Sequence, residues 1–159
     1  LEAVANELAE DGIELISSID YVKDLLAEKG CLTKRKPSEN ETADIKFGWK
    51  IAKEVAGMEI GQCIVVKDRI VLAVEAIEGT NETIKRGGEL GRGKVVVIKL
   101  SKKGQDPRFD VPTIGTETVD YLKEAGVSTL AIEAKKTLIL DKEDTVKLAD
   151  KNKISIIAL

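Results

Sequence analysis

The sequence predicts an α/β fold in which a mixed sheet with flanking helices forms one main domain, preceded by the tail of an upstream α/β domain. Short apolar runs rich in β-branched residues, such as Val95 to Ile98, indicate strands buried on both faces, although periodicity alone does not separate such a run from a buried helix. These runs alternate with amphipathic stretches that begin at capping residues and end at glycines. The 159 residues suffice for one medium domain with a substantial core, or for one domain and part of another.

Residues 1–36 are expected to be the end of an amino-terminal domain and a linker. Leu1 to Gly12 has the pattern of an amphipathic helix, Ile13 to Ile16 that of a short strand, and Tyr21 to Ala27 that of a second helix. The series starts inside a helix pattern and without a methionine, which indicates a fragment of a longer protein. Glu28 to Ser38 is the linker candidate, and its basic cluster suits either solvation or contact with a phosphate. The cluster comprises Lys34, Arg35 and Lys36.

Residues 37–159 are expected to form the main domain, which opens with a helix and a hairpin. Ser38 and Glu41 have the spacing of a capping box, and apolar residues then recur every four positions up to Gly57. Two apolar runs separated by a short turn follow and predict paired strands, Gln62 to Lys67 and Ile70 to Glu75.

A second helix of the main domain is expected from Glu82 to Leu90, with Thr80 or Asn81 as its cap. Glycines at its end are interpreted as the exit from this helix. They are Gly87, Gly88, Gly91 and Gly93. Their spacing and the residues after them do not match a phosphate-binding P-loop.

The last third of the chain predicts two helices and three strands. Thr116 is expected to cap a helix that stops at Gly126, and Asp141 to start the final helix. The predicted strands are Thr129 to Glu133 and Thr137 to Leu140, joined tightly, and a buried final strand at Ile154 to Leu159.

The composition of the chain argues against several classes of function. A formal net charge of −3, with both signs spread along the chain and 3% aromatic residues, gives no basis for nucleic-acid binding. No apolar run approaches the length of a membrane span, and a cytoplasmic protein is expected. Cys31 and Cys63 are expected to be reduced structural thiols.

The chain contains no histidine. A Ser-His-Asp triad, a Cys-His pair and histidine-ligated zinc are therefore excluded within it. Catalysis by these residues must depend on carboxylates, lysines, hydroxyls and a hard metal ion such as Mg²⁺, which prefers oxygen ligands.

The segment after the central run is the leading candidate for a ligand site. Ser101 to Asp110 changes abruptly to a loop of mixed charge, and α/β proteins usually place ligand chemistry in loops that leave buried strands. Its charged residues are Lys102, Lys103, Asp106, Arg108 and Asp110. The alternative is a solvated turn in which Gly104 and Pro107 serve only to reverse the chain.

A second candidate lies at the end of the hairpin. Glu75 and Glu78 stand among apolar neighbours just before Gly79, and a carboxylate there is costly unless it is paired, hydrogen-bonded or bound to a metal. Thr80 and Asn81 open the following helix, whose amino terminus is suited to an anion. The alternative is an ordinary strand end with solvated acids.

Three blocks resemble a known family. They are IGQCIVVKDRIVLAVEAIEGTNE (residues 60–82), KKGQDPRFDVPTIGTETV (102–119) and AIEAKKTLILDKEDTVKLAD (131–150). Together they resemble the carboxy-terminal domain of the LpxI family, the UDP-2,3-diacylglucosamine pyrophosphatases of lipid A biosynthesis. The resemblance covers nearly the whole chain, with residues 1–36 similar to the end of the amino-terminal domain and the linker.

This resemblance implies hydrolysis of UDP-2,3-diacylglucosamine to UMP and 2,3-diacylglucosamine 1-phosphate, assisted by Mg²⁺ or Mn²⁺. It places the essential aspartate at Asp106. Residue chemistry beside the matching strings adds two further sets of expectations. Candidate metal ligands with Asp106 are Asp110, Glu75 and Glu78, and candidate substrate contacts are Gln105, Arg108, Lys102, Lys103, Thr80 and Asn81.

Two departures from the family qualify this expectation. Pro107 follows Asp106, where it biases the backbone toward an extended geometry and removes an N–H donor. Most of the amino-terminal domain is missing, so this fragment alone is expected to be inactive.

Two alternative functions stay open at this stage. One is a non-catalytic nucleotide or phosphosugar binding module. The other is a structural oligomerisation domain with an uncovered sheet edge at Ile154 to Leu159. Peripheral contact with a membrane and a homo-oligomer are the remaining open questions about partners.

Overall fold

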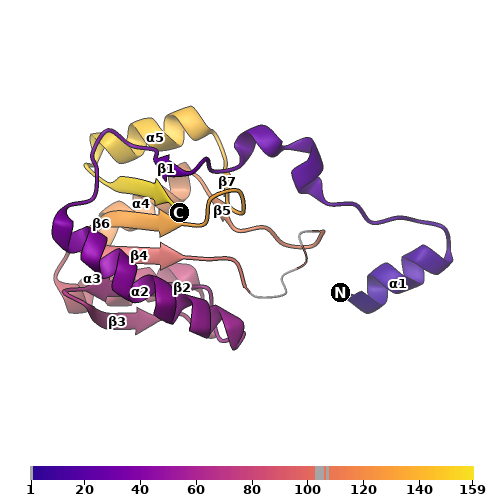
Figure 1. The fold of residues 1–159 in the computed structure, drawn as a ribbon, viewed down its shortest axis with the longest axis horizontal. Helices are drawn as coiled ribbons and strands as arrows, with labels where there is room; N and C mark the ends of the chain where they lie inside the picture. The colour runs from indigo at the N-terminus through magenta and orange to yellow at the C-terminus, as the bar shows by residue number, and fades with distance from the viewer. Residues whose placement is uncertain (1, 103–105, 107) are drawn as a thin grey trace.

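A six-stranded mixed sheet organises the structure, a computed structural model that describes residues 2–102, 106 and 108–159. The strand order is β1-β8-β6-β4-β2-β3 (Figure 1). The strands are β1 (Gly30–Cys31), β2 (Cys63–Lys67), β3 (Ile70–Val74), β4 (Val95–Lys99), β6 (Val127–Ile132) and β8 (Ser155–Ala158). Strands β4, β6 and β8 are parallel, β2 is antiparallel to both β3 and β4, and β1 is antiparallel to β8. The carboxyl ends of β3, β4, β6 and β8 therefore share one edge of the sheet.

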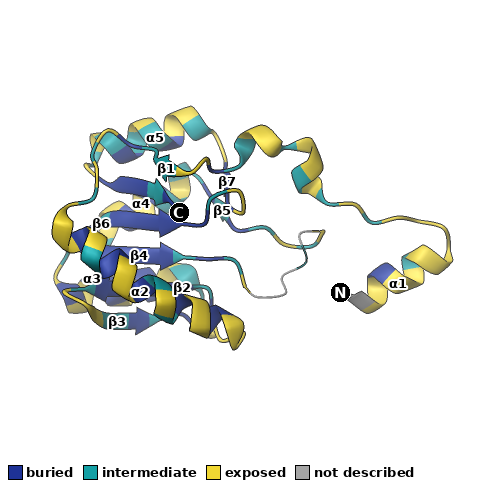
Figure 2. Ribbon diagram, in the orientation of Figure 1, coloured by how far each residue is buried: buried dark blue, intermediate teal, exposed yellow. Residues whose placement is uncertain are grey.

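The centre of the sheet confirms the predicted buried strand. Val95, Val96, Val97 and Ile98 are fully buried in β4. Successive residues of a strand point to opposite faces, so each face of β4 supplies apolar side chains to a core. Figure 2 shows the buried strands between helices whose outer sides are exposed.

The helices cover the two faces of the sheet unequally. On one face, α2 (Glu39–Gly57) packs over β2 and β4, and it is the one helix on this face in the part of the chain that the structure describes. The core on the other face includes side chains from three helices, namely α3 (Thr80–Gly91), α4 (Thr116–Glu124) and α5 (Lys142–Lys151). No helix of the described part of the chain is long and apolar enough to cross a membrane.

The predicted capping box fixes the start of α2. The backbone N–H of Glu41 donates to Ser38 Oγ at 3.3 Å, and the N–H of Ser38 donates to Glu41 Oε2 at 2.7 Å. The helix ends at Gly57, as its pattern predicts.

The glycines of α3 correct the predicted helix boundaries. The helix begins at Thr80 behind Gly79 and ends at Gly91, so neither Thr80 nor Asn81 is its cap. Gly87 and Gly88 lie inside it because the helix packs closely on its neighbours. A Cβ at Gly87 would collide with Val65, and one at Gly88 would collide with the Ala125 carbonyl. These glycines permit close packing rather than an exit from the helix.

The amino-terminal segment differs from its prediction after the first helix. Helix α1 (Glu2–Glu10) forms as expected and lies apart from the sheet (Figure 1). Ile13 to Ile16 forms no strand, and Ile13 and Ile16 are each 52% exposed because no neighbouring strand pairs with them. Instead of a second helix, short 3₁₀ turns occupy Ser18–Tyr21 and Lys23–Leu25. Gly30–Cys31, inside the linker candidate, adds β1 to the sheet.

The predicted strand Thr137 to Leu140 is confirmed as β7 (Leu138–Ile139), which runs parallel to β5 (Thr113–Ile114) in a separate two-stranded sheet. Two other predictions about the last third of the chain are corrected. The cap of α4 is Gly115 rather than Thr116. The final strand β8 is not an open edge, because β1 pairs with its outer side.

Candidate active site

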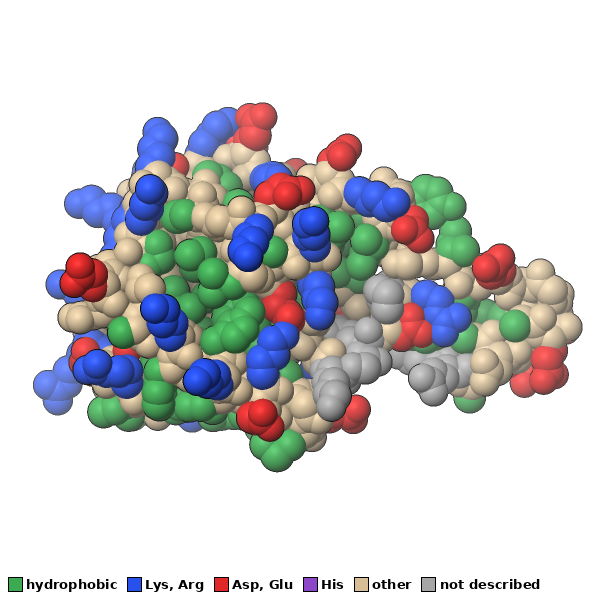
Figure 3. Space-filling view, viewed as in Figure 1, with side chains coloured by type: hydrophobic (Ala, Val, Ile, Leu, Met, Phe, Trp, Pro, Cys, Tyr) green, Lys and Arg blue, Asp and Glu red, His purple; other side chains and the backbone are tan. Residues whose placement is uncertain are grey.

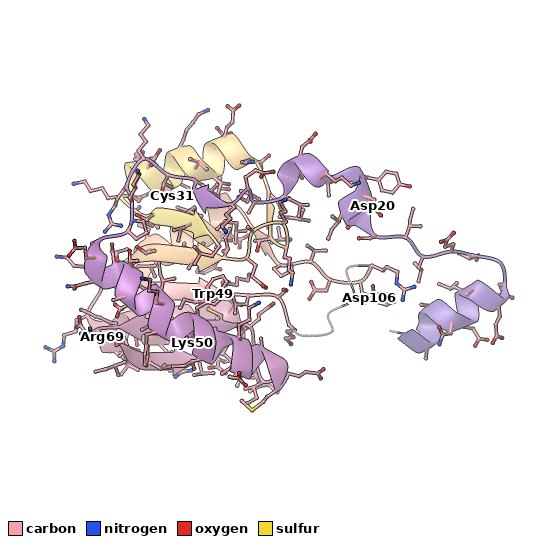
Figure 4. All side chains as sticks on the ribbon, viewed as in Figure 1. Asp20, Cys31, Trp49, Lys50, Arg69 and Asp106 are labelled. Carbon is pink, nitrogen blue, oxygen red and sulfur yellow. The ribbon has the colours of Figure 1, made fainter. Side chains whose placement is uncertain are left out.

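The edge at which β3, β4, β6 and β8 end carries the predicted site. The chain passes from this edge into α3, and α4 and α5 likewise start here and end at the opposite edge, where β6 and β8 begin. Helix amino termini carry partial positive charge and unpaired N–H groups, so three of them at one edge favour an anion. Figure 4 shows Asp106 on the segment beyond the end of β4, with Arg69 at the opposite end of the sheet.

Glu75 follows β3 and is buried, with 7% of its surface exposed. Its Oε1 accepts a hydrogen bond from Thr80 Oγ1 at 2.9 Å, and its Oε2 accepts one from the Gln62 N–H at 3.2 Å. The structure therefore brings together two of the predicted site residues, Glu75 and Thr80. Their hydrogen bonds resolve the cost of burying a carboxylate at this strand end.

Glu78 is held in a different set of contacts. Its Oε1 accepts from Thr83 Oγ1 at 3.3 Å and from Arg86 Nη2 at 2.5 Å, and its Oε2 accepts from the Ala76 N–H at 3.1 Å. Hydrogen bonds from its own backbone and from Arg86 lower the pKa of Glu78. Asn81, at the start of α3, is exposed.

Asp106 forms a bidentate ion pair with Arg108. Arg108 Nε donates to Asp106 Oδ2 at 2.8 Å, Nη2 donates to the same oxygen at 2.6 Å, and the Arg108 N–H donates to Oδ1 at 2.9 Å. These hydrogen bonds lower the pKa of Asp106, which keeps the carboxylate ionised at neutral pH. The Arg108 guanidinium also lies 5.5 Å from the centre of the Phe109 ring.

Four other predicted site residues belong to this loop. Lys102 and Asp110 are exposed, whereas Lys103 and Gln105 lie outside the described residues.

Both ends of the loop are anchored by one stretch of chain, residues 133–140. At the start, Glu133 Oε2 accepts hydrogen bonds from the Ser101 N–H at 2.7 Å and from Ser101 Oγ. At the end, the Leu138 N–H donates to Pro112 O at 2.8 Å, and the Leu140 N–H donates to Ile114 O at 2.9 Å. Residues 133–140 thus fix where the loop leaves the sheet and where it returns.

Glu133 is a further carboxylate at this edge. It is 5% exposed and also pairs with Lys53 and, at 3.6 Å, with Lys136. Burial alone would raise the pKa of Glu133, but hydrogen bonds from Lys53 and Ser101 lower it overall.

Cysteine chemistry is not part of this edge. Both cysteines are free thiols, and Cys63 is fully buried. Burial raises the pKa of the Cys63 thiol far above its ordinary value, so it stays protonated and unreactive.

Two comparisons with known proteins assign the chain to a family. The pattern of the family described as LpxI C-terminal domain matches residues 28–157. The chain is also 33% identical over 158 residues to the UDP-2,3-diacylglucosamine pyrophosphatase LpxI of Caulobacter vibrioides, which covers 94% of this chain and 56% of that protein. The chain belongs to the LpxI family. It spans about half the length of this LpxI relative.

The same chain is similar to a second group of proteins. It is 31% identical over 136 residues to the bifunctional purine biosynthesis protein PurH of Bacillus subtilis, covering 82% of the chain and 23% of PurH. For PurH of Bacillus thuringiensis the identity is 30% over 131 residues, or 79% of the chain and 22% of PurH. The similarity to proteins named PurH therefore extends over about four fifths of the chain at 30–31% identity.

The oxygen atoms at this edge are of the kind that bind a hard cation. Glu75 and Asp106 offer carboxylates, and Gln62 Oε1 is buried without a hydrogen-bond partner among the residues that the structure describes. Within 2–102, 106 and 108–159, no three acidic or cysteine side chains gather in a metal-binding cluster. Mg²⁺ is commonly held by one or two carboxylates and by substrate phosphates, so the set present fits such an ion.

Sequence reasoning did not identify Glu133 or Gln62 as parts of this edge. The sequence contains a signal for Glu133, which directly follows the apolar run of β6 just as Glu75 follows that of β3. It contains no signal for Gln62, because the unpaired state of its side-chain oxygen becomes evident only when β2 is placed beside β4.

Proposed function

We propose that the protein hydrolyses the pyrophosphate bond of UDP-2,3-diacylglucosamine, giving UMP and 2,3-diacylglucosamine 1-phosphate in lipid A biosynthesis. The observation that carries this proposal is the 33% identity to the Caulobacter pyrophosphatase across 94% of the chain. We further propose that the protein acts in the cytoplasm. The part of the relative beyond this chain is proposed to be required for turnover.

In this reaction the charge of the substrate must be offset while water attacks. Water adds its oxygen to one phosphorus as the bridging P–O bond breaks, and the protons of the water pass to the products and solvent. The amino termini of α3, α4 and α5, with Arg108, Lys102 and Lys103, are proposed to offset the phosphate charge. Asp106 is proposed to orient the attacking water, a role that its ionised state supports.

Mg²⁺ or Mn²⁺ is the proposed cofactor, and when bound it would supply Lewis-acid neutralisation of the phosphate oxygens. Asp106 is the leading candidate to hold it, with Glu75, Glu78 and Asp110 as further candidates. Gln62 Oε1 joins this set as a buried acceptor at the same edge. Gln105, Thr80 and Asn81 are proposed contacts to substrate oxygens.

The test is an assay of UMP release from UDP-2,3-diacylglucosamine. It uses this chain and the full-length gene product, each with Mg²⁺, with Mn²⁺ and with EDTA. We expect metal-dependent release by the full-length protein that falls about 10²- to 10³-fold in Asp106→Asn, a size typical of removing one group that stabilises a transition state. Asp120→Asn, an exposed aspartate on α4, is the matched control and should retain activity.

A second function is favoured by the similarity to PurH, because a stretch shared by proteins named for different reactions can serve as a common binding module. In that case the chain binds a nucleotide or phosphosugar without turnover. Retained UMP binding in Asp106→Asn, with no hydrolysis by the folded full-length wild type, would favour this alternative.

A further inference from the structure

Lys99 is a charged residue at the end of β4, whose other residues are apolar and fully buried. Val95 and Val97 belong to the core under α3, α4 and α5, and side chains alternate along a strand, so the Lys99 side chain lies on this same face. Its neighbours in register, Cys63 on β2 and Ile132 on β6, are fully buried in that core. The aliphatic stem of Lys99 therefore lies between strands of the sheet, and the residue as a whole is partly buried.

The ammonium group of Lys99 lies at the carboxyl edge, near the start of α4. Its Nζ donates to Thr113 O at 3.3 Å, and Thr113 precedes Gly115, the cap of α4, by two residues. An ammonium group has three donors, and this bond is long. In the part of the chain that the structure describes, Lys99 makes no other hydrogen bond and no ion pair. Lys99 thus has donors available to a ligand.

Glu75 and Lys99 lie close to each other without pairing. Burial is the main cause of the raised pKa of the Cys63 thiol, the Glu75 carboxylate raises it further, and the Lys99 ammonium group lowers it. Both charges are therefore near the same thiol, at the ends of β3 and β4. The Glu75 oxygens accept hydrogen bonds from Thr80 and Gln62 instead. A carboxylate suits a hard cation and an ammonium group suits a phosphate oxygen, so the two groups together fit a phosphate and its counterion.

Other cations of the molecule are either bound to carboxylates or open to water. Arg108 donates to both oxygens of Asp106, and Lys53 pairs with Glu133. Figure 3, in which the face covered by α2 is turned toward the viewer, shows lysine and arginine side chains projecting from it in several places. Salt screens such exposed charges. A structural link from β4 to β5 needs only one donor, which an uncharged side chain supplies without the cost of partly burying an ammonium group.

We propose that Lys99 is a further catalytic residue, which donates to a non-bridging oxygen of the pyrophosphate that is cleaved. The pyrophosphate then lies at the α3 and α4 side of the carboxyl edge, and not at the side covered by α2. The loop that carries Asp106 starts at Ser101, two residues after Lys99, so both groups are close enough in the chain to act on one anion. That this anion belongs to the substrate rests on the proposed function, whereas binding of a pyrophosphate ion does not.

The probe is inorganic pyrophosphate, because it presents the anion without uridine or acyl chains. Isothermal titration calorimetry measures its binding to the full-length protein at fixed pH and salt, with and without Mg²⁺. We expect saturable binding by the wild type that is about 10- to 100-fold weaker in Lys99→Gln, a size typical of one hydrogen bond to a charged group. Glutamine retains a donor for Thr113 O and removes only the charge. Lys99→Arg, which retains the charge, should bind more tightly than Lys99→Gln.

Two lysines serve as matched controls. Lys67 on β2 is also partly buried and also donates to backbone carbonyls, but at the opposite edge of the sheet. Lys50 is exposed on α2 (Figure 4). Lys67→Gln and Lys50→Gln should bind pyrophosphate as the wild type does, and thermal melts show that each variant is folded. In the UMP-release assay, kcat/KM should fall about 10- to 100-fold in Lys99→Gln and stay unchanged in both controls.

Three outcomes would overturn the inference: no saturable binding of pyrophosphate by the wild type, equal binding by Lys99→Gln, or an equal loss in either control. A loss in Lys50→Gln alone would place the anion on the α2 side and would also overturn it. Calorimetry needs no turnover, so its failure is distinct from that of the proposed hydrolysis. UMP release with the same kcat/KM in Lys99→Gln would leave the hydrolase and remove only the role of Lys99. Pyrophosphate binding that depends on Lys99, in a protein that releases no UMP, would leave the anion site and remove the hydrolase.

Discussion

The two edges of the sheet use charge in different ways. At the carboxyl edge, helix amino termini and a loop containing Asp106 extend beyond the strands, and Gln62 Oε1 has no partner among the residues described there. At the amino edge, helix carboxyl termini face cationic side chains that are bound to the protein itself. Lys67 Nζ, for example, donates to Gly91 O at 2.7 Å and Gly93 O at 3.0 Å, where α3 ends.

Arg35 forms the central contacts of the amino edge. Its Nη2 donates to both oxygens of Glu41, at 2.7 and 2.8 Å, while its Nη1 donates to Ser155 Oγ at 2.6 Å and Ser128 O at 3.1 Å. Burial alone would raise the pKa of Glu41, but hydrogen bonds from Arg35 and Ser38 lower it to about 2. These contacts answer the question left open about the basic cluster, because Arg35 serves the fold rather than a phosphate.

The comparison shows that the charged groups of the amino edge join separate elements of the fold, whereas at the carboxyl edge the Asp106–Arg108 pair lies within one loop. Removing a charge from the amino edge should therefore reduce stability and leave the turnover of folded molecules unchanged. Removing one from the carboxyl edge should act on turnover. Four predictions test this division.

Arg35→Met should have the largest effect on stability. It leaves the mostly buried Glu41 carboxylate without its partner, which typically costs about 3 kcal/mol of unfolding free energy. Urea denaturation measures the loss, and Lys36→Met, at the exposed neighbouring residue, is the control. A loss of activity per folded molecule would contradict the assignment of this edge to stability.

Glu133→Gln should affect both properties, because Glu133 belongs to the core and to the loop anchor. We expect a loss of about 2 kcal/mol from the broken pairs with Lys53 and Lys136, and about a tenfold slower UMP release because Ser101 is held less firmly. Denaturation and steady-state kinetics provide the two readings, with the exposed Glu124→Gln on α4 as control. Unchanged kinetics in a destabilised variant would show that the loop does not depend on this anchor.

Lower pH should weaken the amino edge through Glu41. Its pKa is lowered in the folded state from 4.5 to about 2, so the stabilisation is fully present above pH 4.5 and is lost as the pH falls toward 2. The expected loss is about 1.5 kcal/mol, less than the pKa difference alone would give, because Arg35 is one-third exposed and water screens the pair. In urea titrations, the stability difference between wild type and Glu41→Gln should shrink across this window. A constant difference would contradict the pairing.

Lys67→Met should have the smallest effect, about 1 kcal/mol, because it removes one hydrogen bond to the Gly91 carbonyl at the end of α3 and one to the Gly93 carbonyl just beyond it, while retaining much of the apolar stem. Thermal unfolding monitors the change, and the exposed Lys85→Met on the same helix serves as the reference. Slower UMP release in this variant would mean that the two edges are coupled.

The regular elements of the fold followed from the sequence, because their signals are local. The apolar run of β4, the hairpin of β2 and β3, and the capping box at Ser38 each lie within a few residues of chain. β1 and β5 were missed because two residues are too few to show a period. The glycines of α3 were misinterpreted because their purpose, close approach to Val65 and Ala125, depends on distant parts of the chain.

For the candidate site as well, the residues with a local sequence signal were predicted and those that depend on distant contacts were not. The loop with Asp106 stood out by its change of composition, and Glu75 by its place after an apolar run. The hydrogen bond from Ser101 to Glu133 joins residues 32 positions apart, and no local pattern encodes such a pair.

The anchoring of the Asp106 loop by residues 133–140 has a consequence for how this fold diversifies. Because hydrogen bonds hold both ends of the loop on one neighbouring stretch, the positions of its two ends are fixed independently of the residues between them. Changing the length of a closed loop costs little, since the entropic penalty grows only with the logarithm of its length. The sheet can therefore keep its strands while the length and sequence of this loop change. Such a change is one physical route by which proteins named LpxI and PurH can be similar over this stretch.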